Sequence, residues 1–261
     1  IENINGPLLI IAGAGSGKTR VLTYRYAHLI KTYGINFENV LAITFTNKAA
    51  NEMKDRISDL LNLELSPKWI STFHSLCVKM LRIHGHLIGF NNNFTIYDQS
   101  DSTKLVRNCM RDSDIDTKQY SPKRIQAHIS SLKNQRILPG EAVEFAQSFF
   151  DVKVAEIYSS YQKKLMLANS MDFDDLLIKA VELLETSDKS LNYWSSKFQY
   201  IMIDEYQDTN MVQYRLVELL ASKHKNICVV GDSDQSIYAF RGADIRNIEE
   251  FESDFKDAKV I

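Results

Sequence analysis

A chain of 261 residues can bury a sizeable core and can form one large or two modest domains. Its 25% charged and 44% hydrophobic residues indicate a globular protein, and its net charge of −2 excludes nucleic-acid binding through a bulk basic field. No apolar run reaches membrane-spanning length, and three cysteines without CxxC spacing fit a reducing compartment. We therefore expect a cytoplasmic protein with no membrane contact.

Short apolar runs alternate with helical patterns toward both ends of the chain. Helices are predicted at about 18–33, 48–61 and around 76–81, and strands at 8–11, 40–43, 69–70, 200–203, 227–230 and 259–261. Between about 92 and 172 the pattern is largely helical. The alternation predicts an α/β fold with a parallel sheet, and the helical block predicts a domain at 92–172 inserted into a discontinuous one at 1–91 and 173–261.

The segment AGAGSGKT, residues 12–19, lies between a predicted strand and a predicted helix, which is the setting of a phosphate-binding loop. Glycines let backbone N–H groups turn toward phosphate oxygens, and the helix N-terminus adds its positive dipole end. We expect Lys18 to reach the β and γ phosphates and Thr19 to bind Mg²⁺. The nucleotide-binding residues of the loop are then Ala12, Gly13, Ala14, Gly15, Ser16, Gly17, Lys18 and Thr19.

A second segment, IDEYQD at 203–208, places two adjacent acids at the end of an apolar strand. Asp204 is expected to hold Mg²⁺ directly or through water, and Glu205 to belong to the same metal site and to orient and deprotonate an attacking water. Acids at a strand end often simply meet solvent. Together with the 12–19 loop they favour a nucleotidase site, because ligands of open α/β sheets bind at the carboxyl ends of the strands.

Three more segments follow predicted strands on the same edge: 44–47, 71–74 and 231–242. Two of them combine hydroxyls with a helix N-terminus, which suits phosphate oxygens. Phe45, Tyr238 and Phe240 are candidate stacking platforms for unpaired bases. Each aromatic alone fits core packing as well, but their shared placement on one rim favours stacking.

In chain order, AGAGSGKT, TFTNKAANEM, STFHS, MDFDDL, IDEYQDTN and VVGDSDQSIYAFRGA resemble the motifs of superfamily 1 DNA helicases of the UvrD/PcrA/Rep type. The resemblance covers essentially the whole chain. It implies a RecA-like P-loop ATPase domain with an inserted all-α subdomain. In the intact protein it implies ATP- and Mg²⁺-dependent movement 3′ to 5′ along single-stranded DNA, in DNA repair or replication.

The resemblance also implies roles for single residues. Arg20 matches an arginine on the base side of the nucleotide, and Gln235 matches a catalytic glutamine that senses the γ-phosphate, alongside Lys18 and Glu205. Phe240 stands where close relatives carry tryptophan, and Arg241 matches an arginine that contacts either DNA or neighbouring acids. The DNA-binding positions implied are Thr44, Phe45, Asn47, His74, Tyr238, Phe240 and Arg241.

Two parts of the family pattern are not found in the 261 residues: an adenine-reading segment before the first strand, and a second RecA-like half that carries arginine fingers. We therefore expect an N-terminal half that binds nucleotide weakly, hydrolyses it slowly or not detectably, and does not unwind duplex. Its partners would be that second half, single-stranded DNA and single/double-strand junctions. Two other interpretations remain open: the motor part of a helicase–nuclease, and a regulatory ATP-binding module without motor activity.

The basic residues of the predicted insert favour a solvated helical face, while the resemblance raises duplex contact as an alternative. They include Lys118, Lys123, Arg124, Lys133 and Arg136. The acids of MDFDDL, at 171–176, indicate helix capping and no catalytic role. His84 and His86 do not share a helix face, so we interpret them as non-ligands.

Overall fold

The computed structural model describes residues 2–13, 15–63, 67–232, 251 and 253–261. The chain forms two compact units, one made of Ile1–Leu76 with Leu184–Ile261 and the other of Cys77–Leu183. The range 92–172 that the sequence predicts as an insert lies inside the second unit. Each unit has its own cluster of buried hydrophobic side chains.

The first unit is built on a six-stranded sheet in the order β3-β2-β6-β7-β1-β8, in which every pair of neighbours is parallel. Its strands are β1 (Leu8–Ile11), β2 (Val40–Thr44), β3 (Ile70–Thr72), β6 (Tyr200–Ile203), β7 (Ile227–Gly231) and β8 (Lys259–Val260). The predicted parallel α/β fold is thereby confirmed. Because all neighbours run the same way, the carboxyl ends of the strands lie along one edge.

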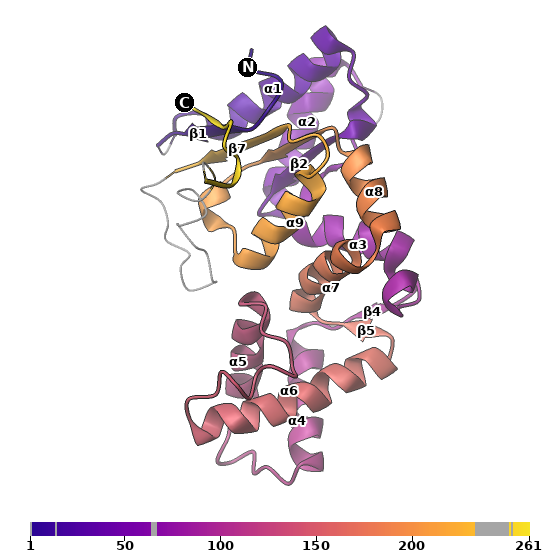
Figure 1. Cartoon of the computed structure of the whole chain (residues 1–261), viewed down its shortest axis with the longest axis vertical. Helices are drawn as coiled ribbons and strands as arrows, with labels where there is room; N and C mark the ends of the chain where they lie inside the picture. The colour runs from indigo at the N-terminus through magenta and orange to yellow at the C-terminus, as the bar shows by residue number, and fades with distance from the viewer. Residues whose placement is uncertain (1, 14, 64–66, 233–250, 252) are drawn as a thin grey trace. The chain divides into compact units, whose positions relative to one another are not determined.

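Helices cover both faces of this sheet. On one face, alternate strand residues pack with buried residues of α1 (Lys18–Tyr33) and α2 (Asn47–Leu61). In the central strands β2, β6 and β7 the intervening residues are buried too, as expected for a parallel sheet between helical layers. Figure 1 shows α9 (Met211–Ala221) across the sheet from α1, and α8 (Asp188–Lys197) belongs to the same unit.

Local signals fix the ends of these helices. Gly34, the C-cap of α1, has a φ angle of 66°, and its N–H donates to the carbonyls of the last turn. Thr46, the N-cap of α2, accepts a hydrogen bond from Ala49 N at 3.1 Å through its side chain. Both helices therefore begin and end within one residue of the predicted positions.

The second unit is mainly helical. Its core is formed by α4 (Gln99–Asp112), α5 (Pro122–Asn134) and α6 (Phe149–Leu167). It also contains a small parallel sheet of β4 (Thr95–Ile96) and β5 (Ser170–Met171), whose two-residue strands are too short to give a sequence pattern. The chain passes between the units in α3 (Phe73–His84) and in α7 (Phe173–Thr186).

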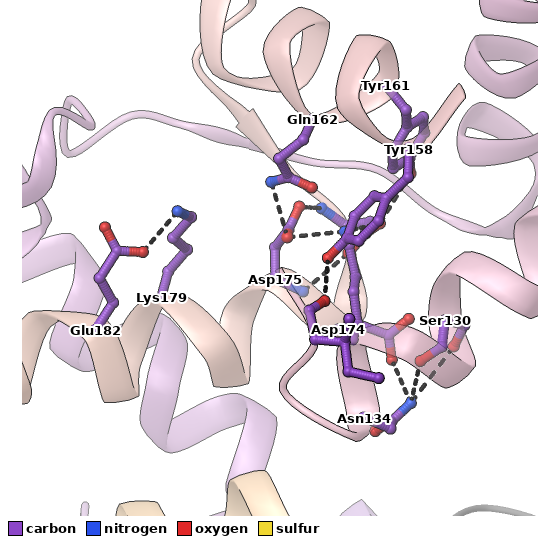
Figure 2. A network of polar contacts seen from close by, with 12 residues as sticks. Ser130, Asn134, Tyr158, Tyr161, Gln162, Asp174, Asp175, Lys179 and Glu182 are labelled. Atoms are coloured by element: carbon purple, nitrogen blue, oxygen red, sulfur yellow. Dashed lines mark hydrogen bonds and ion pairs between the residues drawn. The ribbon is translucent and has the colours of Figure 1, made fainter. Parts of the chain in front are cut away.

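A buried ion-pair network joins α5 to the start of α7. The prediction that Lys133 lies on a basic solvated face is wrong, because its side chain is only 1% exposed. Its Nζ donates to Asp172 Oδ2 at 2.7 Å and to Asp175 Oδ1 at 2.8 Å. Figure 2 shows Asp175 beside Gln162, which donates to it at 3.0 Å. The acids of MDFDDL cap α7 as expected, and they also hold this lysine.

The charges of this network are set by burial and by one another. Burial acts to lower the pKa of Lys133, but the two carboxylates and their hydrogen bonds outweigh it and hold that pKa above the usual range. Burial raises the pKa of Asp175 to about 6, although Lys133 opposes the rise. Burial also acts on Asp172, yet the ammonium and its hydrogen bond keep that pKa low. A lysine that is charged in the folded protein therefore stabilises this turn.

Candidate nucleotide and DNA site

The glycine-rich loop connects β1 to α1 at the carboxyl edge of the sheet. Gly15 and Gly17 have φ angles of 71° and 89°, a left-handed conformation in which a side chain is strained. Gly17 is the N-cap of α1, and no side-chain hydrogen bond caps this end of the helix. The first N–H groups of α1 therefore offer a binding surface for an anion. Ala12 N donates to Gly231 O at 3.0 Å, which ties the loop to the end of β7.

Two oxygen-bearing side chains, a hydroxyl and a carboxylate, meet where α1 begins and β6 ends. Thr19 Oγ1 donates to Asp204 Oδ2 at 2.6 Å, across 185 residues of sequence. Asp204 is 3% exposed, and its burial, together with the nearby charge of Glu205, raises the pKa of its carboxyl, while the Thr19 hydrogen bond opposes the rise. A poorly hydrated carboxylate beside a hydroxyl is stabilised by a nearby positive charge.

Lys18 lies at the centre of the described site. Its side chain is 7% exposed, and its Nζ lies 2.9 Å from Asp232 Oδ2 and 4.0 Å from Glu205 Oε2. Asp232 directly follows β7 and is 2% exposed. The ammonium is thus held by acids from two neighbouring strand ends, at the position where phosphate oxygens would otherwise pair with it.

Glu205 has an unusual backbone. It adopts φ 50° and ψ 46°, the left-handed region, which costs a non-glycine residue roughly 1–2 kcal/mol. Its side chain accepts a hydrogen bond from Gln207 Nε2 at 2.8 Å, and its carbonyl accepts one from Asp208 N at 2.9 Å. These contacts keep its carboxylate on the Lys18 side of the edge, although it is less buried than Asp204.

The expected DNA-binding residues that the structure describes lie on two neighbouring strand ends of the same edge. Phe45, partly buried after β2, packs edge-on against Phe73 with ring centroids 5.7 Å apart. Asn47 is exposed at the first turn of α2. Thr44 is buried, and its hydroxyl donates to the carbonyl two residues later at 3.1 Å, so it shapes the turn. Burial lowers the pKa of His74 at the start of α3, which favours its neutral form.

Gly13 and Ser16 lie in the glycine-rich loop, where Ser16 N donates to Gly13 O at 3.3 Å. Arg20 is exposed on α1, with its guanidinium 5.5 Å from the centroid of the Tyr24 ring. The others lie outside the described residues: Ala14, Gln235, Tyr238, Phe240 and Arg241.

Comparison with known proteins agrees with this geometry. Residues 1–256 match the family model of the UvrD/REP helicase N-terminal domain. The chain belongs to this family. Over all 261 residues, this UvrD/REP helicase N-terminal domain is 49% identical to the ATP-dependent DNA helicase PcrA of Staphylococcus epidermidis and to that of Staphylococcus aureus. It spans 36% of the length of these relatives. None of the helices described in this UvrD/REP domain is long and apolar enough to cross a bilayer.

Two residues of this site were not among those predicted from the sequence. Asp232 was noted only as part of the loop after β7, and Gln207 was given no role. Both are polar residues that directly follow or closely follow a fully buried strand, where an unpaired polar group is costly. That pattern is a usable signal, but the bond between Lys18 and Asp232 depends on β1 and β7 being neighbours in the sheet.

Proposed function

We propose that this domain is the ATPase half of a DNA motor that couples ATP hydrolysis to 3′-to-5′ movement along single-stranded DNA. The observation that carries the proposal is the convergence of Lys18, Thr19, Asp204 and Glu205 at one edge of a parallel sheet. The relatives' name, ATP-dependent DNA helicase, supports it. We further propose that the motor needs a second RecA-like half, and that single/double-strand DNA junctions and a repair or replication role belong to the longer protein.

The chain's own residues supply most of the nucleotide chemistry. Lys18 would exchange its bond to Asp232 for oxygens of the β and γ phosphates, because both are anionic partners for one ammonium. The N–H groups at the start of α1 would bind further phosphate oxygens. Glu205 would accept a proton from the attacking water, and its fixed carboxylate would orient that water toward the γ-phosphate.

The residues present also fit Mg²⁺. The Thr19 hydroxyl and the Asp204 carboxylate already meet at 2.6 Å, and both are the hard oxygen ligands that Mg²⁺ prefers. Glu205 follows directly and offers a second carboxylate, so we propose these three residues as the metal site. A bound Mg²⁺ would supply charge neutralisation for the β and γ phosphates.

DNA binding is proposed for the neighbouring rim. Phe45 offers an aromatic face at the end of β2, and the N-terminus of α2 beside Asn47 suits a backbone phosphate. His74 follows β3, the next strand along the same edge. Because both ligand sites share one edge, changes at the phosphates can alter contacts to DNA.

We place the protein in the cytoplasm, where its three free cysteines would stay reduced.

The test measures nucleotide and DNA binding on the 261-residue chain. A fluorescent ATP analogue with Mg²⁺ should bind, and Lys18→Ala should weaken that binding at least tenfold. Lys48→Ala, which removes a lysine that is 89% exposed, should not change it. Fluorescence anisotropy of a labelled single strand should then change when a nonhydrolysable ATP analogue is added.

The rim is tested with Phe45→Ala, which should weaken single-strand binding several-fold without altering nucleotide affinity. Tyr33→Ala is the matched control, since it removes a half-exposed aromatic at the opposite end of α1. Nucleotide binding that Lys18→Ala leaves intact would refute the site. Nucleotide binding with no nucleotide-sensitive DNA binding would instead favour the regulatory module.

A further inference from the structure

Gln207 lies between two parts of the site and bonds to both. Its Nε2 donates to Glu205 Oε2 at 2.8 Å, and its Oε1 accepts from the backbone N of Asp232 at 3.0 Å. Gln207 is 1% exposed, so its carboxamide is shielded from bulk water, while the Glu205 side chain that it contacts is 38% exposed. One buried carboxamide therefore joins the end of β6 to the first residue after β7.

Only a carboxamide in one orientation fits this position. If its ends were exchanged, the Gln207 oxygen would face the Glu205 carboxylate and its NH₂ would face the Asp232 N–H. A glutamate in its place would keep the acceptor for Asp232 but would put a second carboxylate against Glu205. A methionine of similar length would lose both bonds.

The contacts form a closed ring. Asp232 pairs with Lys18 at 2.9 Å, and Lys18 lies 4.0 Å from the same Glu205 oxygen that Gln207 holds. Glu205 is also the residue with the left-handed backbone, a conformation that persists only when its surroundings determine it. Gln207 thus contacts the side chain of the strained residue and the main chain of the lysine's partner.

We propose that Gln207 is a positioning residue, which fixes the Glu205 carboxylate in register with Asp232 and, through Asp232, with Lys18. This proposal rests on the proposed ATPase function for its effect on turnover. It assigns Gln207 no contact with nucleotide. Loss of Gln207 should therefore reduce the hydrolytic step while leaving nucleotide affinity nearly unchanged.

Two variants separate the two bonds. Gln207→Glu keeps the acceptor for Asp232 but replaces the donor to Glu205 with a carboxylate oxygen, and Gln207→Met removes both the donor and the acceptor. Gln213→Met is the matched control, because Gln213 is also buried and, within the part of the chain that the structure describes, its side chain bonds in the N-terminal cap of α9. The control should lose some stability but leave the site intact.

Turnover is measured with radiolabelled ATP and excess protein, since we expect slow hydrolysis by the isolated chain. Both Gln207 variants should hydrolyse at least about tenfold more slowly than wild type, the scale of a misplaced general base. Affinity for the fluorescent ATP analogue should stay within about threefold. Gln213→Met should match wild type in both measurements.

A second measurement needs no turnover. Hydrogen exchange of the Asp232 amide, followed by NMR without nucleotide, should accelerate at least about tenfold in Gln207→Met. It should stay near the wild-type rate in Gln207→Glu and in Gln213→Met. This pattern would separate the link to Asp232 from general loosening of the fold.

The turnover and exchange measurements together decide whether Gln207 positions Glu205 and Asp232. Unchanged Asp232 exchange in Gln207→Met overturns the proposal, whether or not the chain hydrolyses ATP. Full turnover by both Gln207 variants also overturns it, as does an equal loss of affinity and turnover. If wild type shows no hydrolysis at all, as an isolated half without its partner allows, the exchange rates alone decide the role of Gln207.

Discussion

Replacing Lys133 by methionine should destabilise the protein more than removing any single surface charge. The substitution keeps the length of the side chain but removes the ammonium that bonds Asp172 and Asp175 at 2.7 and 2.8 Å. Both aspartate side chains are nearly buried, so the change leaves two uncompensated carboxylates inside the second unit. Removing one partner of a buried ion pair costs about 3–5 kcal/mol, and we expect that loss in the free energy of unfolding at pH 7.

The loss in the free energy of unfolding should be smaller at acidic pH. Without Lys133, burial raises the folded-state pKa of both aspartates, and the opposing charge is gone. A folded pKa above the unfolded value contributes stability that is present at low pH and is lost as pH rises through the folded pKa. Because Asp175 already has a pKa of about 6 with the lysine present, the variant's deficit relative to wild type should be clearly smaller at pH 5 than at pH 7.5.

Urea unfolding followed by far-ultraviolet circular dichroism measures both effects. Lys104→Met is the matched control, since Lys104 is 68% exposed in the same unit and its pair with Asp101 is at the surface. It should cost less than about 1 kcal/mol at either pH. A Lys133→Met deficit no larger than the control's, or one independent of pH, would refute the reasoning.

Three smaller predictions concern the first unit and the cysteines. Thr46→Ala removes the side-chain cap of α2 and should lower the free energy of unfolding by about 1 kcal/mol in urea titrations. Gly34→Ala strains a left-handed C-cap and should cost about 1 kcal/mol, seen as a lower Tm in calorimetry. Burial raises the pKa of the Cys77, Cys109 and Cys228 thiols, that of Cys228 to about 11, so a thiol reagent at pH 8 should label them slowly in buffer and rapidly in urea.

The fold was largely predictable because its signals are local. Apolar runs gave the six strands of the parallel sheet, and Gly34 marked the end of α1. The prediction for Lys133 failed because it relied on the charge of the residue and not on its position in the helical repeat of apolar residues. It follows Ile125 and Ile129 at four-residue steps, so it lies on the buried stripe of α5, and its partners lie some forty residues later in sequence.

The candidate site was predictable only in part for a related reason. Sequence motifs name the residues that face a ligand, such as Thr19 and Asp204, and the structure brings these two together. Gln207 faces other protein groups, and its importance depends on a bond to Asp232 across neighbouring strands. Such contacts follow from strand order, which spacing along the chain does not reveal.

The strand order also determines when each strand can pair while the chain is being synthesised. Leu8 in β1 pairs with Cys228 on one side and with Lys259 on the other, so this strand has no partner in the sheet until β7 has been synthesised. At about 5–20 residues per second, the ribosome takes roughly ten to forty seconds to synthesise the stretch from β1 to β7. β1 is therefore synthesised before the other strands of the sheet and pairs late, while the helical unit encoded between β1 and β7 can fold from local contacts in the meantime.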